Sequence, residues 1–207
     1  MPICSNCGKH QSLLAQFVHH PERLNLGAPG RVLLVFQCNN NPDMCPTWEG
    51  GAGANACFVL DADELTDSLT PLPDDSPEIE LEARVTEWIA REDGISADQI
   101  PAFYDDEQLF NLPEELRKSV CSITKLGSVP DWVQSPSQAP GEGWVFVGQL
   151  DCVYSLFEEP YWRPAPDPYQ WEGRGWMAGC LNFGDAGMGY IFLRHQPVGK
   201  PDGLFFW

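Results

Sequence analysis

Four cysteines near the start of the chain have the spacing of a metal site. The pattern is Cys-x2-Cys, thirty residues, then Cys-x6-Cys, and it consists of Cys4, Cys7, Cys38 and Cys45. A tetrahedral zinc site needs four thiolates that two short turns bring together, and Cys-x-x-Cys supplies one such turn. The second turn, CNNNPDMC, is wider, but Asn, Pro and Asp readily form tight turns. We therefore predict one structural zinc ion bound by these four cysteines.

Other uses of the cysteines are weaker readings of the same pattern. A redox Cys-x-x-Cys follows a strand and opens a helix, whereas Cys4 precedes any strand that we predict. A catalytic zinc keeps an open coordination position, often with His and Glu ligands, and no HExxH or HxE…CxxC spacing is present. Inert or disulfide-bonded cysteines remain an alternative. The remaining four lie singly among apolar residues, as core cysteines do: Cys57, Cys121, Cys152 and Cys180.

No further catalytic motif stands out. The sequence lacks a G-x-S-x-G nucleophile elbow, a Walker A loop and a dinucleotide fingerprint. Thirty acidic residues could supply a carboxylate pair for glycoside hydrolysis, but nothing selects one pair from the rest. We therefore expect a protein that is not an enzyme.

The acidic charge is concentrated in the middle of the chain. The net charge is −18, and residues 61–118 hold 18 acids and 4 bases, a local net charge of −14. Such a field repels nucleic acid and anionic membranes and attracts a basic protein. Ordinary solubility charge is the simple alternative. We predict a basic partner, no nucleic acid and no membrane partner.

Two segments are candidates for the partner-binding surface. The first is the acidic segment, whose blocks of neighbouring carboxylates are Asp74, Asp75, Asp105, Asp106, Glu107, Glu114 and Glu115. The second is the Pro-rich aromatic loop over residues 161–176, with Tyr161, Trp162 and Trp171. Proline fixes the backbone and large rings supply contact area, which suits a binding surface and equally suits a rigid loop over the protein's own sheet.

The elements that position these residues fall into three regions of one domain, 1–207. Residues 1–60 and 119–207 carry strand-type runs bounded by glycine, and residues 61–118 form an acidic, partly helical insertion. The outer regions resemble two copies of one unit. The first copy reads LLAQF then GRVLLVFQC, and the second reads FVGQLD then GMGYIFLRH, each with a buried-looking glutamine in its first run.

The insertion contains two predicted helices. In the segment 77–93 four apolar side chains fall on one helical face: Leu81, Val85, Trp88 and Ile89. Gly94 follows this segment and is expected to end the helix. PEELRKS, from Pro113, predicts a shorter helix with its acids in the first turn. The predicted fold class is α+β and mostly β, with two pseudo-symmetric β repeats, a helical acidic insertion and a zinc-ribbon-like pair of turns at the N-terminus.

No segment indicates membrane insertion or export. There is no apolar run of 18 residues, and no basic region followed by an apolar core opens the sequence. We expect a cytoplasmic protein with reduced thiols.

Several segments resemble known families. TKLGSVPDWVQSP (124–136), GWVFVGQLD (143–151) and FGDAGMGYIFL (183–193) resemble the YwqG-like family, a bacterial domain of unknown function. Gly-Ser stands where that family has Gly-Gly, which puts the geometry of this turn in question. CSNCGKHQSLLAQF and the cysteine-bearing segments after it resemble the repeat shared with the programmed cell death 2 family of eukaryotes, whose members resemble chaperones for a basic ribosomal protein.

The resemblances imply a mostly β, two-repeat domain without a shared catalytic set. An acidic binding protein on this scaffold is expected to be an immunity protein that neutralises a bacterial toxin, a nuclease, by occluding its basic active site. A chaperone for a basic ribosomal or nucleic-acid-binding protein is one alternative. A carbohydrate-binding protein, suggested by eight tryptophans, is another.

Overall fold

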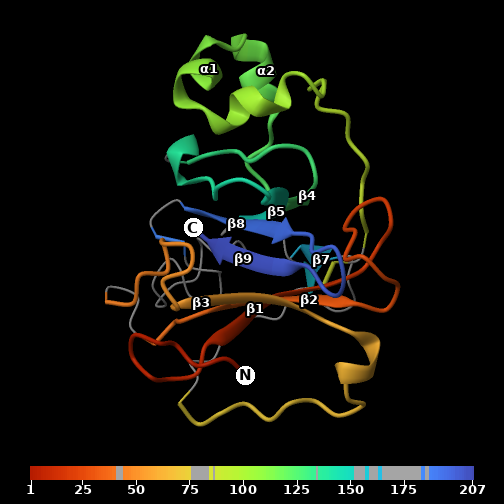
Figure 1. The fold of residues 1–207 in the computed structure, drawn as a ribbon, viewed down its shortest axis with the longest axis vertical. Helices are drawn as coiled ribbons and strands as arrows, with labels where there is room; N and C mark the ends of the chain where they lie inside the picture. Colours follow the sequence, from red (N-terminus) through yellow and green to blue (C-terminus); the bar gives the residue numbers. More distant parts are fainter. Residues whose placement is uncertain are drawn as a thin grey trace.

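The computed structural model describes residues 1–40, 44–75, 84–85, 87–133, 135–151, 157–158, 163–164, 183–184 and 187–207. Over these residues the chain is mostly β, as predicted, with a few short helices (Figure 1). Seven strands form one curled antiparallel sheet in the order β1-β2-β3-β9-β8-β5-β4. Its strands are β1 (Ser12–Val18), β2 (Val32–Gln37), β3 (Asn55–Leu60), β4 (Lys125–Leu126), β5 (Val145–Asp151), β8 (Met188–Arg194) and β9 (Asp202–Phe206). Strands β6 (Phe157–Glu158) and β7 (Arg163–Pro164) form a separate ribbon.

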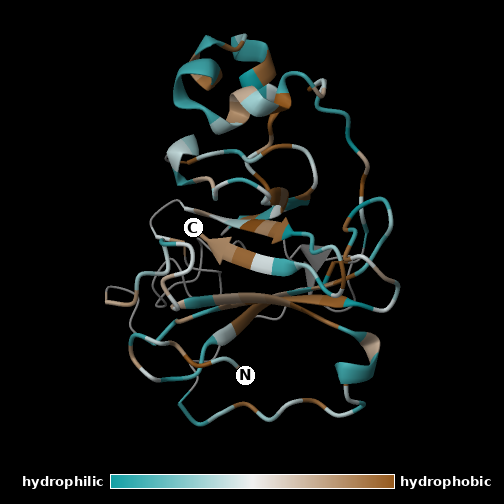
Figure 2. Ribbon diagram, viewed as in Figure 1, coloured by the Kyte–Doolittle hydropathy of each residue, from teal (hydrophilic) through white to brown (hydrophobic). Residues whose placement is uncertain are grey.

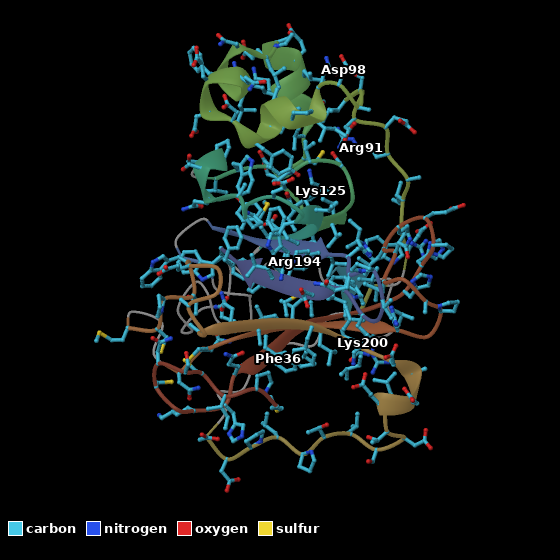
Figure 3. The ribbon with its side chains drawn as sticks, viewed as in Figure 1. Phe36, Arg91, Asp98, Lys125, Arg194 and Lys200 are labelled. Atoms are coloured by element: carbon cyan, nitrogen blue, oxygen red, sulfur yellow. The ribbon has the colours of Figure 1, made fainter. Side chains whose placement is uncertain are left out.

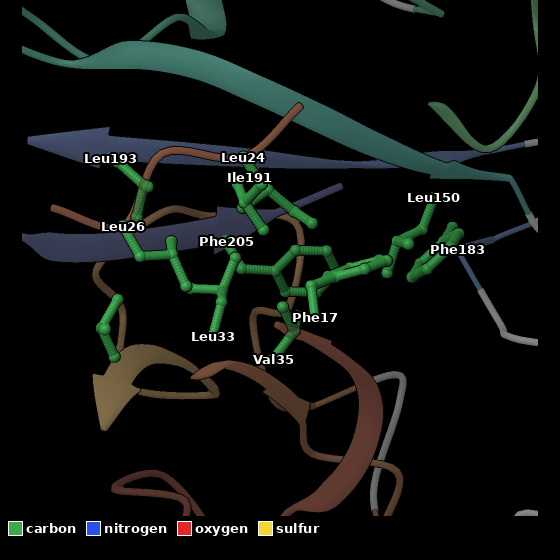
Figure 4. Close-up of a cluster of buried hydrophobic side chains, with 11 residues drawn as sticks. Phe17, Leu24, Leu26, Leu33, Val35, Leu150, Phe183, Ile191, Leu193 and Phe205 are labelled. Atoms are coloured by element: carbon green, nitrogen blue, oxygen red, sulfur yellow. The ribbon is translucent and has the colours of Figure 1, made fainter. Parts of the chain in front are cut away.

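Strand β8 is buried on both faces. Its first six residues are all buried, because MGYIFLR is a continuous apolar run that must be covered on each side of the sheet. Ile191 and Leu193 face the inside of the curl, where strands from both halves of the sheet meet (Figure 4). This inner cluster consists of Phe17, Leu24, Leu26, Leu33, Val35, Val59, Leu150, Phe183, Ile191, Leu193 and Phe205.

The outer face of β8 carries a second, aromatic cluster. Phe192 stacks on Phe206 with ring centroids 5.8 Å apart, and Trp132 covers Tyr190 at 4.7 Å. The Trp132 indole N–H donates to the carbonyl oxygen of Phe103 at 2.7 Å. Trp132 therefore joins the sheet to the insertion. Figure 2 shows the hydrophobic residues concentrated in the strands, with hydrophilic residues on the connecting loops.

The insertion folds into short helices above the β4 edge of the sheet (Figure 1). These are η2 (Ile100–Tyr104), α1 (Asp106–Asn111) and α2 (Glu114–Ser119). Helix α2 confirms the helix predicted from PEELRKS. Asp105 caps α1 by accepting a hydrogen bond from the Gln108 backbone N–H at 2.9 Å. We call residues 95–120 the helical lobe. Two further 3₁₀ turns are η1 (Ala62–Glu64) and η3 (Pro136–Gln138).

The longer helix predicted over residues 77–93 is wrong wherever the structure describes that segment. Residues 84–85 and 87–93 are not helical, while 76–83 and 86 lie outside the described residues. Trp88 packs beside Phe17 of β1, with ring centroids 6.4 Å apart, and beneath the Arg23 guanidinium. Val85 and Ile89, which the helical pattern placed on the same face, are 57% and 83% exposed. The contact of one tryptophan with the sheet therefore replaces the predicted helical face.

The two predicted repeats occupy opposite halves of the sheet. Strand β1 pairs with β2, β5 pairs with β8, and each pair has a register shift near the start of its first strand. The matched glutamines differ, because Gln149 is fully buried whereas Gln16 is exposed. The pseudo-symmetry therefore stays a prediction. Among the described residues no helix has the length and apolar character needed to cross a bilayer.

Gln149 supports the turn that leads into the sheet. Its amide nitrogen donates to the carbonyl oxygens of Cys121 and Ile123 at 3.1 and 3.0 Å, and its amide oxygen accepts from the Asp131 backbone N–H at 3.0 Å. A buried backbone group that loses such a partner costs about 1–3 kcal/mol. These three bonds hold both ends of the segment 121–131 on strand β5.

We predict that Gln149→Leu lowers the free energy of unfolding by about 2–4 kcal/mol, since three backbone groups lose their partner. Gln16→Leu, at the matched but exposed position of β1, is expected to change it by less than about 0.5 kcal/mol. Urea unfolding followed by tryptophan fluorescence measures both. Equal losses in the two variants would contradict the role assigned to Gln149.

Candidate metal centre

The first cysteine turn is shaped by backbone hydrogen bonds and one glycine. The Gly8 N–H donates to the Cys4 carbonyl oxygen at 2.9 Å, and the Cys4 N–H donates to the Lys9 carbonyl oxygen at 2.8 Å. Gly8 has φ +73°, a left-handed conformation that glycine adopts without steric cost. The turn therefore reverses the chain within a few residues and directs Cys4 and Cys7 to one side.

The second pair of cysteines comes from the end of β2 and the loop after it. Cys38 directly follows β2, and its N–H donates to the carbonyl oxygen of Ala54 at 2.8 Å. Cys45 lies beyond residues 41–43, which are outside the described residues. Its loop is fastened to the C-terminal end of the chain, because the Trp207 indole N–H donates to the Thr47 hydroxyl at 2.8 Å.

The four sulfur atoms converge as predicted. The Sγ atoms of Cys4 and Cys45 are 3.7 Å apart and those of Cys7 and Cys38 are 3.6 Å apart, and all four lie within 4.8 Å of one another. A tetrahedral zinc ion with bonds of about 2.3 Å needs sulfurs about 3.8 Å apart. A disulfide needs about 2.05 Å. The arrangement is one that can hold a metal ion, and all four cysteines are free thiols.

The pKa values of the thiols shift in opposite directions, depending on burial and on nearby hydrogen-bond donors. Cys4, Cys38 and Cys45 are buried, and Cys7 is partly exposed. Burial raises the pKa of Cys4, but the backbone N–H groups of Cys7 and Asn6 outweigh it together with the neighbouring thiols, and the pKa falls from 9.0 to about 7. Burial raises the pKa of Cys38 and of Cys45. The fold alone thus favours the thiolate at Cys4 and opposes it at Cys38 and Cys45, whereas a bound cation would favour the thiolate form of its ligands.

The donor set indicates a structural role for a bound ion. Four sulfurs complete a tetrahedral shell, whereas a catalytic zinc keeps one position open for water or substrate. The turn, the end of β2 and the loop before β3 all meet at this centre. A metal ion here would therefore fasten the N-terminal segment to the β2–β3 hairpin.

Sequence reasoning missed the glycine-rich segment that supports this centre. GGAGA, at residues 50–54, faces the first cysteine turn: the Gly53 carbonyl oxygen accepts from the Ser5 N–H at 3.0 Å. The carbonyl oxygen of Ala52 accepts from the Asn6 side chain at 3.0 Å. No local pattern identifies this contact, because Ser5 and Gly53 are 48 residues apart.

The predicted partner-binding acids lie in two separate places. Asp74 and Asp75 are exposed, and Asp75 lies beside His10 in the N-terminal segment. The other five are in the helical lobe, at one end of the long axis of the molecule (Figure 1). Asp75 pairs with His10, with Oδ1 and Nδ1 2.6 Å apart, and this hydrogen bond lowers the pKa of the carboxyl group. The acidic segment therefore does not form one continuous surface.

The acids of the helical lobe differ in how they are held. Asp105 caps α1, Asp106 accepts a hydrogen bond from the Ser135 hydroxyl at 3.0 Å, and Glu114 pairs with Lys118 one turn along α2. Glu107 and Glu115 are exposed and have no partner within the described part of the chain. The predicted aromatic residues Tyr161, Trp162 and Trp171 lie outside the described residues.

We predict that Gly53→Ala destabilises the N-terminal segment. A Cβ atom there would lie 1.9 Å from Ser5 Oγ and 3.0 Å from Ser5 Cβ, so the cysteine turn must move. Gly51→Ala is the matched control, because its φ of +82° nearly equals the +80° of Gly53 and no atom lies within 4 Å of its Cβ position. The free energy of unfolding of the reduced protein should be about 1–3 kcal/mol lower for Gly53→Ala than for Gly51→Ala. Indistinguishable values would show that the two segments are not in contact.

Comparison with known proteins identifies no relative of this chain. No protein-family model, no curated protein and no solved structure matches the chain. The resemblances to the YwqG-like and programmed cell death 2 families therefore stay predictions.

Proposed function

We propose that this chain is a non-enzymatic protein that binds one basic protein, and that its scaffold is stabilised by a structural zinc ion. In the form that we favour, the partner is a bacterial toxin with a basic active site, such as a nuclease, and the chain is its immunity protein. The observation that carries the proposal is the excess of acidic over basic residues in the helical lobe, which lies at one end of the molecule (Figure 1).

The charges of the helical lobe support a basic partner. Residues 95–120 contain six acids and two bases, and both bases are already engaged: Lys118 pairs with Glu114, and Arg117 lies over the Phe110 ring at 5.9 Å. Phe110 itself is 77% exposed and lies on helix α1, which carries Asp106 and Glu107 in its first turn. An aromatic side chain beside unneutralised carboxylates offers contact area and electrostatic steering to a basic cleft.

The packing of the helical lobe also supports binding. Phe103 and Val120, buried together with Val129, form its core, and the hydrogen bond from Trp132 to the Phe103 carbonyl oxygen fixes it to the sheet. A preorganised surface loses little conformational entropy when it binds. This packing supports the proposal that the lobe acts as an inhibitor that enters a preformed active site.

Zinc is the ion that we propose for the four-cysteine centre. Four thiolates in a closed tetrahedral shell are a frequent structural zinc site, and reduced thiols fit the cytoplasm, where we place the protein. Apparent zinc-binding free energies of about 10–16 kcal/mol at such sites become folding free energy. Zinc would then stabilise the scaffold while the acidic lobe provides recognition.

The alternative partner is a basic ribosomal or nucleic-acid-binding protein, for which the chain would act as a chaperone. The same acidic lobe would serve both roles, so the identity of the partner distinguishes them. The carbohydrate-binding alternative depends on the aromatic segment 161–176, most of which lies outside the described residues.

For the metal, we predict one zinc ion per chain in untagged, freshly reduced protein, measured by plasma mass spectrometry. Cys38→Ser should lose the ion and lower the melting temperature markedly, because one of four ligands is missing. Cys121→Ser is the control, since Cys121 lies outside the sulfur cluster. A metal content near zero in wild-type protein, or equal losses in both variants, would refute the assignment.

For the partner, we predict that wild-type protein captures a basic protein from native lysate at low salt, and that mass spectrometry identifies it as a toxin. Glu107→Lys with Glu115→Lys should weaken this capture by about tenfold or more, because both carboxylates are exposed and unpaired. Asp63→Lys with Asp67→Lys makes the same change of charge outside the lobe and should weaken capture far less. Recovery of a ribosomal protein would instead favour the chaperone role, and equal effects of the two double variants would exclude the lobe as the interface.

A further inference from the structure

The four sulfurs of the candidate metal centre are not equally accessible. Three of them belong to buried residues: Cys4, Cys38 and Cys45. Cys7 is partly exposed, and the residue after it, Gly8, is exposed. Among the described residues, no atom beyond the chain neighbours of Gly8 lies within 4 Å of the position that a Cβ there would occupy. A small solute can therefore approach the centre from the side of Cys7.

The sulfur of Cys38 lies within reach of Cys7. Their Sγ atoms are 3.6 Å apart, and a disulfide bond of about 2.05 Å requires them to approach by roughly 1.5 Å more. Cys38 is held in place, because it follows β2, two residues beyond Phe36 (labelled in Figure 3), and its N–H donates to the Ala54 carbonyl oxygen at 2.8 Å. Cys7 lies in the short turn that Gly8 ends. The approach therefore requires a movement of this turn and none of the sheet.

Access decides which of the four ligands a peroxide oxidises first. Cysteine binds zinc as a thiolate, so a bound ion would hold all four sulfurs in the form that reacts with peroxides. Oxidation among such thiolates follows their exposure to solvent. Cys7 is the member of the cluster that solvent reaches, whereas the surrounding protein shields the three buried sulfurs. We therefore expect the first oxidation at Cys7.

We propose that Cys7 is an oxidation site for hydrogen peroxide, that Cys38 completes the reaction by forming a disulfide with it, and that this reaction releases the metal ion. The inference rests on the structural metal ion proposed above and adds a redox control of its site. The observations that carry it are the exposure of Cys7 among three buried ligands and the 3.6 Å separation of its sulfur from that of Cys38. Cys57 and Cys121, the other described cysteines, lie outside this cluster.

The reaction has two steps. In the first, the Cys7 thiolate attacks one oxygen of hydrogen peroxide, the O–O bond breaks, and Cys7 becomes a sulfenic acid while hydroxide leaves. In the second, the Cys38 thiolate attacks the Cys7 sulfur, the S–S bond forms, and the S–O bond breaks to release a second hydroxide. Two protons from solvent convert the hydroxides into water. One peroxide is thus reduced, and two thiolates are oxidised to one disulfide.

The disulfide would replace the metal ion as the link between the turn and the sheet. Cys4 and Cys45 are the two ligands that remain after the reaction, and two thiolates do not complete the tetrahedral shell of a structural zinc ion. The ion therefore leaves, while the new bond joins residues 31 positions apart and keeps the turn at the end of β2. Reduction by a dithiol would restore the four-sulfur site.

The probe is hydrogen peroxide, titrated in substoichiometric steps into reduced, untagged full-length protein whose zinc content has been measured. After each step the remaining thiols are alkylated, released zinc is measured with a coloured chelator, and disulfides are identified by mass spectrometry of unreduced peptides. We expect Cys7–Cys38 as the first disulfide, with one zinc ion released for each. A different first disulfide, or none within the cluster, would overturn the proposal. Absence of zinc before oxidation would refute the metal assignment, which the order of disulfides does not test.

Matched ligand substitutions test the role of exposure. Cys7→His keeps four zinc ligands, since three cysteines and one histidine also form structural sites, and it removes the exposed thiol. Cys45→His makes the same change of ligand at a buried position. Peroxide should release zinc about tenfold or more slowly from Cys7→His than from wild type, and at nearly the wild-type rate from Cys45→His. Equal rates in the two variants would overturn the assignment. If either variant is isolated without zinc, the order of disulfides in wild-type protein decides.

Discussion

Strand β8 imposes the main constraint on this structure, because its apolar side chains point to both faces of the sheet. A strand that is buried on both sides needs cover on both sides. The curl of the sheet covers the inner face, where Ile191 and Leu193 meet side chains of β1 and β2. The outer face is covered by the aromatic cluster around Trp132. Because Trp132 also binds the Phe103 carbonyl oxygen, covering β8 positions the helical lobe.

The cysteine centre lies near the N-terminus, where the buried residues belong to a separate cluster from the inner core. The residues around it form few contacts with the inner core, and the buried cluster there consists of cysteines and Ala54. Sulfur ligation can therefore supply the cohesion that apolar packing does not. The hydrogen bond from Trp207 to Thr47 extends this support to the end of β9. The turn with Cys4 and Cys7, the loop with Cys45 and the end of β9 are therefore connected through this region.

The sequence predicted features that depend on local chemistry, and it failed where distant contacts decide. The cysteine cluster follows from turn-forming residues around Cys4 and Cys45, and α2 follows from the acids and proline at its start. Of the helix predicted over residues 77–93, the described residues 84–85 and 87–93 are not helical, because the contact of Trp88 with Phe17 depends on where β1 lies, which no local pattern contains. Gln16 and Gln149 have similar apolar neighbours in the sequence. Gln149 is buried and hydrogen-bonded to the segment 121–131, whereas Gln16 is exposed.

The fold redistributes the acidic charge that the sequence concentrates in one segment. In the sequence, residues 61–118 form one acidic block, and the structure divides this block between the two ends of the molecule (Figure 1). Acids near the N-terminal side are partly paired: Asp75 is hydrogen-bonded to His10, and Glu64 forms an ion pair with Lys200. Those of the helical lobe include Glu107 and Glu115, which no described residue neutralises. The helical lobe therefore presents exposed carboxylates without a described partner at the end of the molecule away from the metal centre, which is where the proposed basic partner would bind.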